Sequence, residues 1–303
     1  MPGPDAVLRH NAFVYDSEEE YLAIAVDFLR EGLEQGEGAV VANTRPGLHA
    51  MRDALGDHAA SVRFVDVSEA YTRPAKTLAA YHEVYAQELG RAPTLRAVAD
   101  VQFGPLPGEW DLWTGYEAVF NRSFAHLPAW VLCSYRAGSL PPTIEEGVWR
   151  THPEVVSGGT WSDSASYDER NEPWRPDRAR GVLTESRSVD LADDLDVVRD
   201  RLVDTMHRDG MPAERILDMV LASAEVLANA TTHGAGLRAV RTGRVDGRGA
   251  CEVVDQGPGF DDPWAGYLAP VTGRGSGLWV ARQLTWDLEF FWSPDGFTAR
   301  ITA

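Results

Sequence analysis

One stretch of the chain, EVLANATTHG at residues 225–234, spaces three polar side chains in a way that could support chemistry. Glu225, Asn229 and His233 are four residues apart, so on a helix they form a single stripe. Such a stripe is most often a face exposed to water. Here alanines flank the stripe and two glycine-rich loops follow it along the chain, which favours a ligand site.

The first of these loops, DQGPGF, follows the apolar run CEVV and begins at Asp255. A carboxylate at the end of a strand can accept a hydrogen bond from an exocyclic amino group, such as that of adenine. Gly257 and Gly259 would let the backbone pass close to a planar ring. A tight turn at a strand end is common by itself, so the aspartate is the informative residue.

The second loop, GRGSGLWVARQL at residues 273–284, is a glycine-rich segment that opens a helix. The first N–H groups of a helix lack partners within the helix and favour an anion. Gly275 and Gly277 would allow phosphates to approach closely. Arg274 and Arg282 could add positive charge, although an exposed surface arginine is the commoner case. Taken alone, this loop would be interpreted as a flexible connector. Its position after the other two motifs is what favours a phosphate-binding role.

The elements that must position these motifs begin near residue 183. The segment 190–210 and the segment 212–234 predict two amphipathic helices, each ended by a glycine. Strands follow over 237–247 and 249–255, then the helix GLWVARQL, then a hairpin with its turn at Pro294-Asp295-Gly296. This order predicts an α+β sandwich with helices on one face of a mixed sheet.

Residues 10 to about 150 alternate between strand and helix patterns instead. This alternation predicts an α/β domain whose mostly parallel sheet is flanked by helices. Residues 156–182 are polar and rich in turn formers, and we interpret them as a linker that docks through Trp161 and Trp174. The predicted domains are therefore 1–155 and 183–303.

Composition narrows the classes of function. The 303 residues carry a formal net charge of −18, which disfavours direct nucleic-acid binding and suits a basic protein partner. Lys76 is the only lysine, so a GxxxxGK[ST] phosphate loop is excluded. Without a long apolar run or a signal peptide pattern, we expect a cytoplasmic protein that does not span a membrane. Cys133 and Cys251 are predicted to be buried free thiols.

The three motifs in this order resemble the GHKL ATPase superfamily over about 185–303. Within it, Glu225, Asn229, Ala230 and His233 look like the E-x-x-x-N-A-x-x-H box of the anti-sigma-factor serine kinases. The short segment between the glycine loops is similar to the abbreviated ATP lid of that group.

This resemblance implies roles for individual residues. Glu225 would be the general base toward a serine hydroxyl, or would orient it. The resemblance assigns binding of ATP and Mg²⁺ to seven residues, with Asn229 as the metal ligand and Asp255 as the adenine ligand: Asn229, Asp255, Gly257, Gly259, Gly273, Gly275 and Gly277.

The N-terminal segment, about residues 9–160, resembles the MEDS sensory domain, which implies an α/β fold and an unidentified small-molecule ligand. Four residues are candidates for its sensing site: His10, Cys133, Tyr135 and His152. A His/Cys metal site is conceivable, but the spacing matches no zinc pattern. Because ligands gather beyond the carboxyl ends of parallel strands, Cys133 and Asp100 are favoured over His10. Each candidate taken alone is more often a core residue.

The aromatic side chains at helical spacing from Trp110 to Phe120 are likewise expected in the core.

The expected function is that of a signalling regulator of transcription in the stress response. It would phosphorylate a serine or threonine of an anti-sigma antagonist of the STAS type and sequester a sigma factor, under control of the N-terminal sensor. A homodimer is one option for its oligomeric state. One alternative is an inactive nucleotide-binding partner switch. Another is an atypical histidine kinase, although no phosphoacceptor motif surrounds His207.

Overall fold

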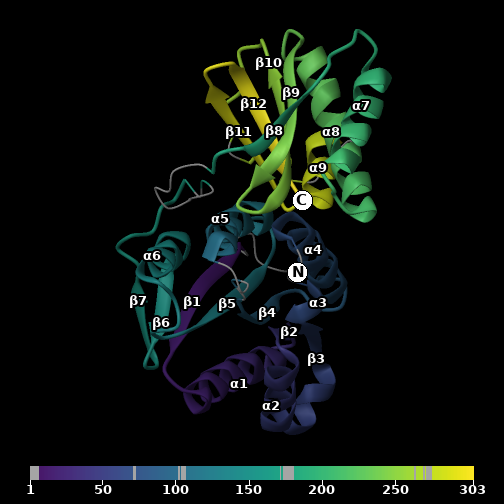
Figure 1. Cartoon of the computed structure of the whole chain (residues 1–303). Helices are drawn as coiled ribbons and strands as arrows, with labels where there is room; N and C mark the ends of the chain where they lie inside the picture. Colours follow the sequence, from purple (N-terminus) through teal and green to yellow (C-terminus); the bar gives the residue numbers. More distant parts are fainter. Residues whose placement is uncertain are drawn as a thin grey trace. The chain divides into compact units, whose positions relative to one another are not determined.

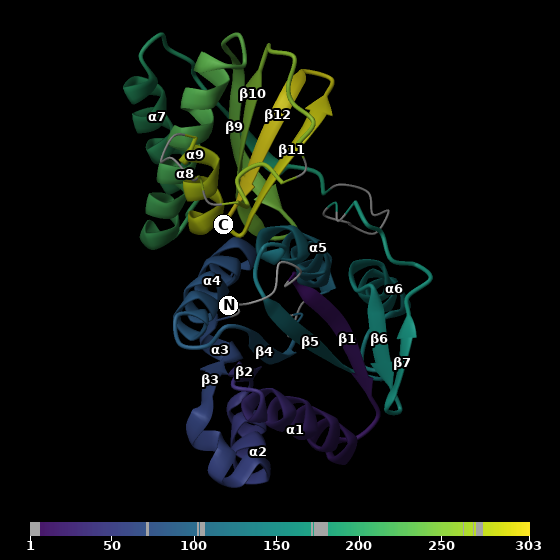
Figure 2. The same cartoon turned by 180° about the vertical axis from the view of Figure 1, so that it is seen from behind.

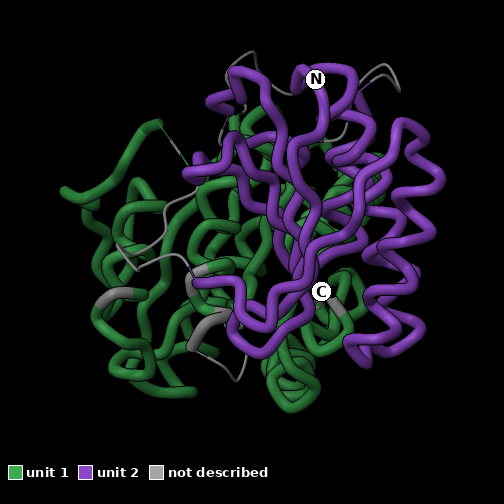
Figure 3. Tube along the Cα trace, turned by 45° about the horizontal axis from the view of Figure 1, so that its top comes forward, with its two compact units in different colours: residues 1–177 green, residues 178–303 purple. Residues whose placement is uncertain are grey.

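The computed structural model describes residues 7–70, 73–101, 103, 107–170, 172, 181–262, 264–268, 270 and 275–303. The chain forms two compact units, residues 1–177 and 178–303, shown in different colours in Figure 3. Each unit has its own sheet and its own hydrophobic core. Among the described helices, none has the length and hydropathy needed to cross a membrane.

The N-terminal unit is built on a seven-stranded sheet in the order β3-β2-β4-β5-β1-β6-β7. Every neighbouring pair is parallel except β6 and β7, which form an antiparallel hairpin at the edge. The strands are β1 (Arg9–Tyr15), β2 (Gly38–Asn43), β3 (Val62–Asp66), β4 (Leu95–Asp100), β5 (Ala129–Arg136), β6 (Glu154–Ser157) and β7 (Thr160–Asp163). The predicted parallel α/β architecture is confirmed.

Helices cover both faces of this sheet, with α1 and α2 on one side and α4 and α5 on the other (Figures 1 and 2). The helices are α1 (Glu18–Glu34), α2 (Arg45–Leu55), α3 (Val67–Ala70), α4 (Pro74–Leu89), α5 (Pro107–Phe124) and α6 (Pro142–Thr151), with a 3₁₀ turn over Gly56–Ser61. Ser17 caps α1, because its hydroxyl accepts the N–H of Glu20 at 3.1 Å. Trp113 and Phe120 of α5 are buried in the core, as their spacing indicated.

The predicted linker over 156–182 begins too early. Its first residues belong to β6 and β7, which extend the sheet beyond β1. Val156 is buried in the core, and the ring of Trp161 lies 5.7 Å from that of Trp130. These strands were not predicted because the segment is polar. Its polarity is compatible with a strand because β7 lies at the edge of the sheet and its four residues are all exposed. Trp174 lies outside the described residues.

The C-terminal unit is a five-stranded sheet in the order β11-β12-β10-β9-β8. The strands are β8 (Thr184–Val189), β9 (Leu237–Val245), β10 (Arg248–Asp255), β11 (Asp287–Ser293) and β12 (Gly296–Thr302). All four neighbouring pairs are antiparallel, so the expectation of a mixed sheet is wrong in this respect. Tight turns reverse the chain between β9 and β10 and between β11 and β12. By contrast, β8 and β9 are joined through α7 and α8, and β10 and β12 are neighbours although β11 separates them in the sequence.

Three helices pack on one face of this second sheet: α7 (Leu195–Arg208), α8 (Ala213–Thr232) and α9 (Gly277–Leu284) (Figures 1 and 2). Leu202, Met219 and Cys251 meet between helices and sheet and are fully buried. Cys251 and Cys133 are both buried free thiols, as predicted. This packing fixes the rotation of α8 about its axis, so that the stripe carrying Asn229 runs along the edge of the core.

Because Val156 of β6 is buried, a substitution at this residue tests directly whether the N-terminal domain extends past residue 155. Replacing Val156 with aspartate should cost the N-terminal unit about 3 kcal/mol or more of unfolding free energy, because an unpaired charge would be buried. The same change at exposed Thr160 of β7 should be close to neutral. Urea unfolding followed by circular dichroism measures both. Equal, small effects at the two positions would show that this segment is a linker after all.

Candidate functional site

A cavity of about 340 Å³ opens in the C-terminal unit between α8, the end of β10, the start of α9 and the last two strands. Its walls are mostly apolar, with a few polar groups at its two ends. The lining residues are Val226, Asn229, Ala230, His233, Gly234, Val253, Asp255, Gly259, Phe260, Gly275, Gly277, Leu278, Phe290, Phe297 and Ala299. An apolar pocket with a small number of placed polar groups is the usual form of a small-molecule site.

One end of the cavity is closed by Asp255, the last residue of β10. Its side chain is 9 % exposed, and one carboxylate oxygen accepts the backbone N–H of Gly257 at 2.8 Å. Burial raises the pKa of Asp255 above the ordinary value for an aspartate. A carboxylate held among apolar walls is suited to accept a hydrogen bond from an amino group on a flat ligand.

Glycines bring the backbone close together around this carboxylate. A β-carbon at Gly257 would lie 2.6 Å from Cα of Gly234, and one at Gly234 would lie 2.5 Å from Cγ of Asp255. Gly259 has φ +64° and lies against the ring of Phe297. Gly257 therefore shapes the pocket through its contact with Gly234, whereas Gly234 and Gly259 line the pocket.

The other end of the cavity meets the start of α9. Gly275 adopts φ +78°, and Ser276 at the N-cap of this eight-residue helix makes no side-chain capping bond. The first N–H groups of a helix have no partner within the helix, and the helix dipole favours negative charge there. Gly277 lies under the Glu225 carboxylate, because a β-carbon added at Gly277 would be 2.5 Å from its Oε2 atom.

Asn229 lies one turn along α8 from Glu225 and lines the cavity. The glutamate and the asparagine are about 6 Å apart along the helix axis. The helix therefore carries an amide that lines the cavity and a carboxylate that lies beside Gly277, which also lines it. Such a pair of oxygen donors suits a hard divalent cation or a hydroxyl group.

Some sequence candidates fall elsewhere. Gly273 and Arg274 lie outside the described residues. Arg282 is buried, donates to the carbonyl of Ala265 at 2.7 Å and has its guanidinium 3.7 Å from the ring centroid of Tyr267, so it is not a surface arginine. His233 is the C-cap residue of α8 and also lines the cavity.

Three phenylalanines of the pocket were not among the predicted site residues. Phe260, Phe290 and Phe297 have ring centroids within 6.3 Å of one another. Phe260 is the last residue of the first glycine loop, and the other two lie in the last hairpin. Aromatic residues in strands are usually read as core, so the signal that could have identified them is only their closeness to the loop.

In the N-terminal unit, three of the four sensor candidates come together with a residue that was not predicted. We call this group the buried His–Cys–Glu cluster; it consists of His10, Glu117, Cys133 and His152. His10 contacts Cys133 at 3.0 Å, whereas Asp100, which was favoured over His10 as a sensing residue, is not part of this cluster. Tyr135 lies beside the cluster, with its ring 5.7 Å from that of His152.

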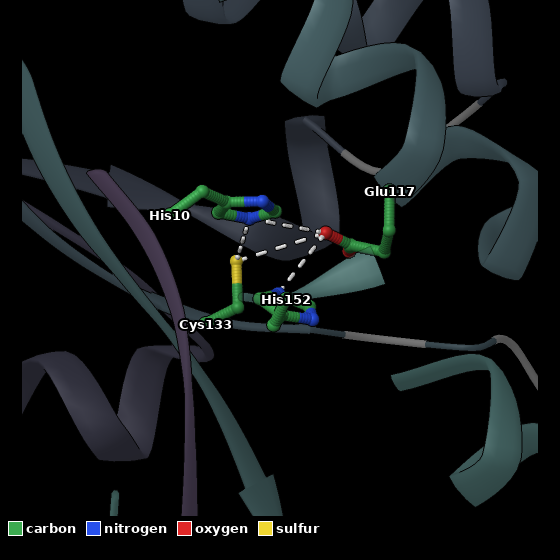
Figure 4. Close-up of side chains that lie close together, drawn as sticks. All are labelled: His10, Glu117, Cys133 and His152. Carbon is green, nitrogen blue, oxygen red and sulfur yellow. Dashed lines mark hydrogen bonds and ion pairs between the residues drawn. The ribbon is translucent and has the colours of Figure 1, made fainter. Parts of the chain in front are cut away.

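This cluster lies within the sheet and not beyond the carboxyl ends of its strands, since His10 belongs to β1 and Cys133 to β5. Strand β1 runs parallel to β5 in the middle of the sheet, so His10 is brought over the body of β5. Glu117 reaches the same place from α5 (Figure 4). The predicted helix around Glu117 is rich in aromatic residues, and no local sequence pattern marks Glu117 as buried.

Burial dominates the acid–base behaviour of the cluster. It lowers the pKa of His10 to about 4 and that of His152 to about 3, since a charged imidazole loses its hydration. It raises the pKa of Glu117 to about 7 and that of the Cys133 thiol well above its usual range. The cluster thus favours its neutral forms.

Comparison with known families agrees with these two architectures. Residues 9–153 match the family described as MEDS, the MEthanogen/methylotroph, DcmR Sensory domain. Residues 189–303 match the histidine kinase-like ATPase domain family. No curated protein sequence matched the chain. The chain therefore carries an N-terminal MEDS sensory domain and a C-terminal domain of the histidine kinase-like ATPase family.

The glycine contacts can be tested by a matched pair of alanine substitutions. Gly257→Ala should reduce the unfolding free energy by about 1–3 kcal/mol, because the new methyl group meets the backbone of Gly234. Gly277→Ala should cost much less, because its methyl group meets only the tip of the Glu225 side chain, which can swing away. Urea unfolding of both variants measures the difference. Equal costs would contradict the tight contact between the two backbone segments.

Proposed function

We propose that the C-terminal unit binds ATP with Mg²⁺ and transfers the γ-phosphoryl group to a serine or threonine of a partner protein. The observation that carries this proposal is the position of Glu225. Its carboxylate lies beside Gly277, the first residue of α9, which lines the pocket at the end where the first N–H groups of a helix suit phosphates. A partner switch that only holds a nucleotide has no need of a carboxylate there.

The two ends of the pocket support this orientation of the nucleotide. Asp255 among apolar walls suits the adenine, since its carboxylate can accept from the exocyclic amino group. Gly275 and Gly277 suit the phosphates, because the absence of side chains leaves the backbone N–H groups accessible. The chain contains no GxxxxGK[ST] loop, so backbone amides, arginine or a metal must hold the phosphates.

Asn229 is the residue that would hold Mg²⁺, since its side-chain oxygen is a hard donor at this end of the cavity. The ion would supply positive charge to neutralise the phosphate oxygens. Glu225 would orient the partner's hydroxyl and take its proton as the oxygen attacks the γ-phosphorus. The bond from that phosphorus to the β–γ bridging oxygen breaks, and ADP leaves.

The proposed partners are those of the anti-sigma serine kinases that the C-terminal motifs resemble. We take the acceptor to be an anti-sigma antagonist of the STAS type, and we take the same module to sequester a sigma factor in the cytoplasm. The strongly acidic chain, at −18, favours a partner with a basic surface. The MEDS domain would control this activity in response to a small molecule, which makes the protein a regulator of transcription, with stress response as its setting.

Nucleotide binding is tested by thermal unfolding with ATP and Mg²⁺. At an ATP concentration one hundred times the dissociation constant, binding should increase the unfolding free energy of the wild type by about 2.7 kcal/mol and so raise its melting temperature. Asn229→Ala and Asp255→Asn should lose most of this shift, because each removes a proposed ligand while leaving the core intact. Leu217→Ala, on an exposed position of α8, is the control and should keep the shift. If the wild type shows no shift with millimolar ATP and Mg²⁺, the pocket does not bind ATP.

Phosphoryl transfer is tested with labelled ATP and a STAS-type antagonist. We expect acid-stable label on the partner, and a loss of about 10²–10⁴-fold in rate for Glu225→Gln with ATP binding kept. Acid-labile label on this protein would indicate a histidine kinase instead. Nucleotide binding without transfer to any acceptor, in the wild type as in the variant, would indicate a partner switch.

A further inference from the structure

The buried His–Cys–Glu cluster joins four elements of the N-terminal unit. His10 comes from β1, Cys133 from β5 and Glu117 from α5, while His152 directly follows α6. All four side chains are at most 4 % exposed. Their nitrogen, sulfur and oxygen atoms lie within 4.8 Å of one another and converge on one point (Figure 4).

The two histidines present the same ring nitrogen to the centre of the cluster. Nδ1 of His10 lies 2.9 Å from Oδ1 of Asn121, and the Asn121 amide nitrogen donates to the carbonyl of Thr151 at 2.6 Å. This second bond fixes the Asn121 oxygen toward His10, so Nδ1 of His10 carries the proton. Nε2 of His10 then offers a lone pair to the cluster.

His152 is held in the same way. Its Nδ1 lies 2.9 Å from the carbonyl of Val148, which can only accept, so Nδ1 carries the proton. Its Nε2 faces Glu117 with a lone pair and has no hydrogen-bond partner, although it is fully buried. A histidine with Nδ1–H bonded to a carbonyl and Nε2 directed inward has the arrangement typical of metal ligands.

The distances between the donor atoms have the scale of a tetrahedral coordination shell. Zn–N and Zn–O bonds of about 2.1 Å and a Zn–S bond of about 2.3 Å require donor atoms to lie roughly 3.4–3.6 Å apart in a tetrahedron. Nε2 of His10 lies 3.0 Å from Sγ of Cys133 and 3.4 Å from Oε2 of Glu117. The Cys133–Glu117 distance is 3.7 Å and the His152–Glu117 distance is 3.9 Å.

The cluster fits neither a polar network of the core nor a site built around a nucleophilic cysteine. A polar network would satisfy its members, whereas Nε2 of His152 and Oε1 of Glu117 are buried without partners. A nucleophilic cysteine would need access for a substrate, whereas Cys133 is 4 % exposed. An ion needs neither an open cleft nor a further hydrogen-bond donor.

We propose that the buried His–Cys–Glu cluster binds one divalent transition-metal ion of the zinc type. A thiolate, a carboxylate and two neutral imidazoles would balance the two charges of the ion, so the filled site would be neutral in the core. Four protein ligands close the coordination shell, which is the pattern of structural zinc sites. The ion would hold β1, β5, α5 and the end of α6 together, and Asn121 would be a positioning residue that orients His10.

The full-length protein tests this directly with Co²⁺ in place of Zn²⁺. We expect one Co²⁺ per chain, a thiolate-to-cobalt charge-transfer band in the near ultraviolet, and visible bands typical of tetrahedral cobalt. Zn²⁺ should displace the cobalt and raise the melting temperature of the N-terminal unit relative to chelator-treated protein. If wild-type protein binds no stoichiometric Co²⁺ or Zn²⁺, or binds cobalt without the thiolate band, the proposal is wrong.

The two free cysteines provide a matched control. Cys133→Ser should lose the charge-transfer band, while Cys251→Ser, which alters an equally buried thiol of the other unit, should keep it. Asn121→Ala should weaken metal affinity by about 10–100-fold with the band retained, as measured by competition with a chromophoric chelator. A band that survives in Cys133→Ser or vanishes in Cys251→Ser would overturn the assignment. Should Cys133→Ser fail to fold, the wild-type cobalt spectrum and the Asn121→Ala affinity still decide the question.

Discussion

The backbone amide of Gln256 holds together the two segments on which the C-terminal pocket depends. It lies 3.0 Å from the carbonyl of Gly234 and 3.2 Å from that of Gly236, and so ties the end of α8 to the loop after β10. Only glycine permits this approach, because a side chain at Gly257 would meet the backbone of Gly234. This junction sets the position of Asp255 relative to the end of α8, which carries Asn229.

Much of the C-terminal site could be predicted from the sequence because its residues lie at the ends of elements. Asp255 ends a strand and Gly277 begins a helix, and such positions carry local signals in the form of glycines and apolar runs. The stripe on α8 could be read from helical periodicity alone. The antiparallel pairing of the sheet and the aromatic wall could not, because they depend on which strands become neighbours in space.

The N-terminal unit shows where such reasoning stops. Its alternation of strands and helices predicted the parallel sheet, but no local sequence pattern determines the order of the strands in that sheet. His10 meets Cys133 only because β1 lies next to β5, and Glu117 joins them only through the packing of α5. The hairpin of β6 and β7 was not predicted for a different reason: an exposed edge strand does not need alternating apolar residues, so its sequence resembles that of a loop.

The central place of β1 in its sheet has a consequence for the synthesis of the chain. Its first strand pairs with β5 and β6, so Asn11 meets Leu132 on one side and Glu154 on the other. During synthesis, more than half of the unit's remaining helices and strands must therefore leave the ribosome before β1 can pair with β5 or β6. Until then β1 has two unpaired edges, and such non-local pairing makes folding slow and leaves this nascent segment dependent on protection from aggregation.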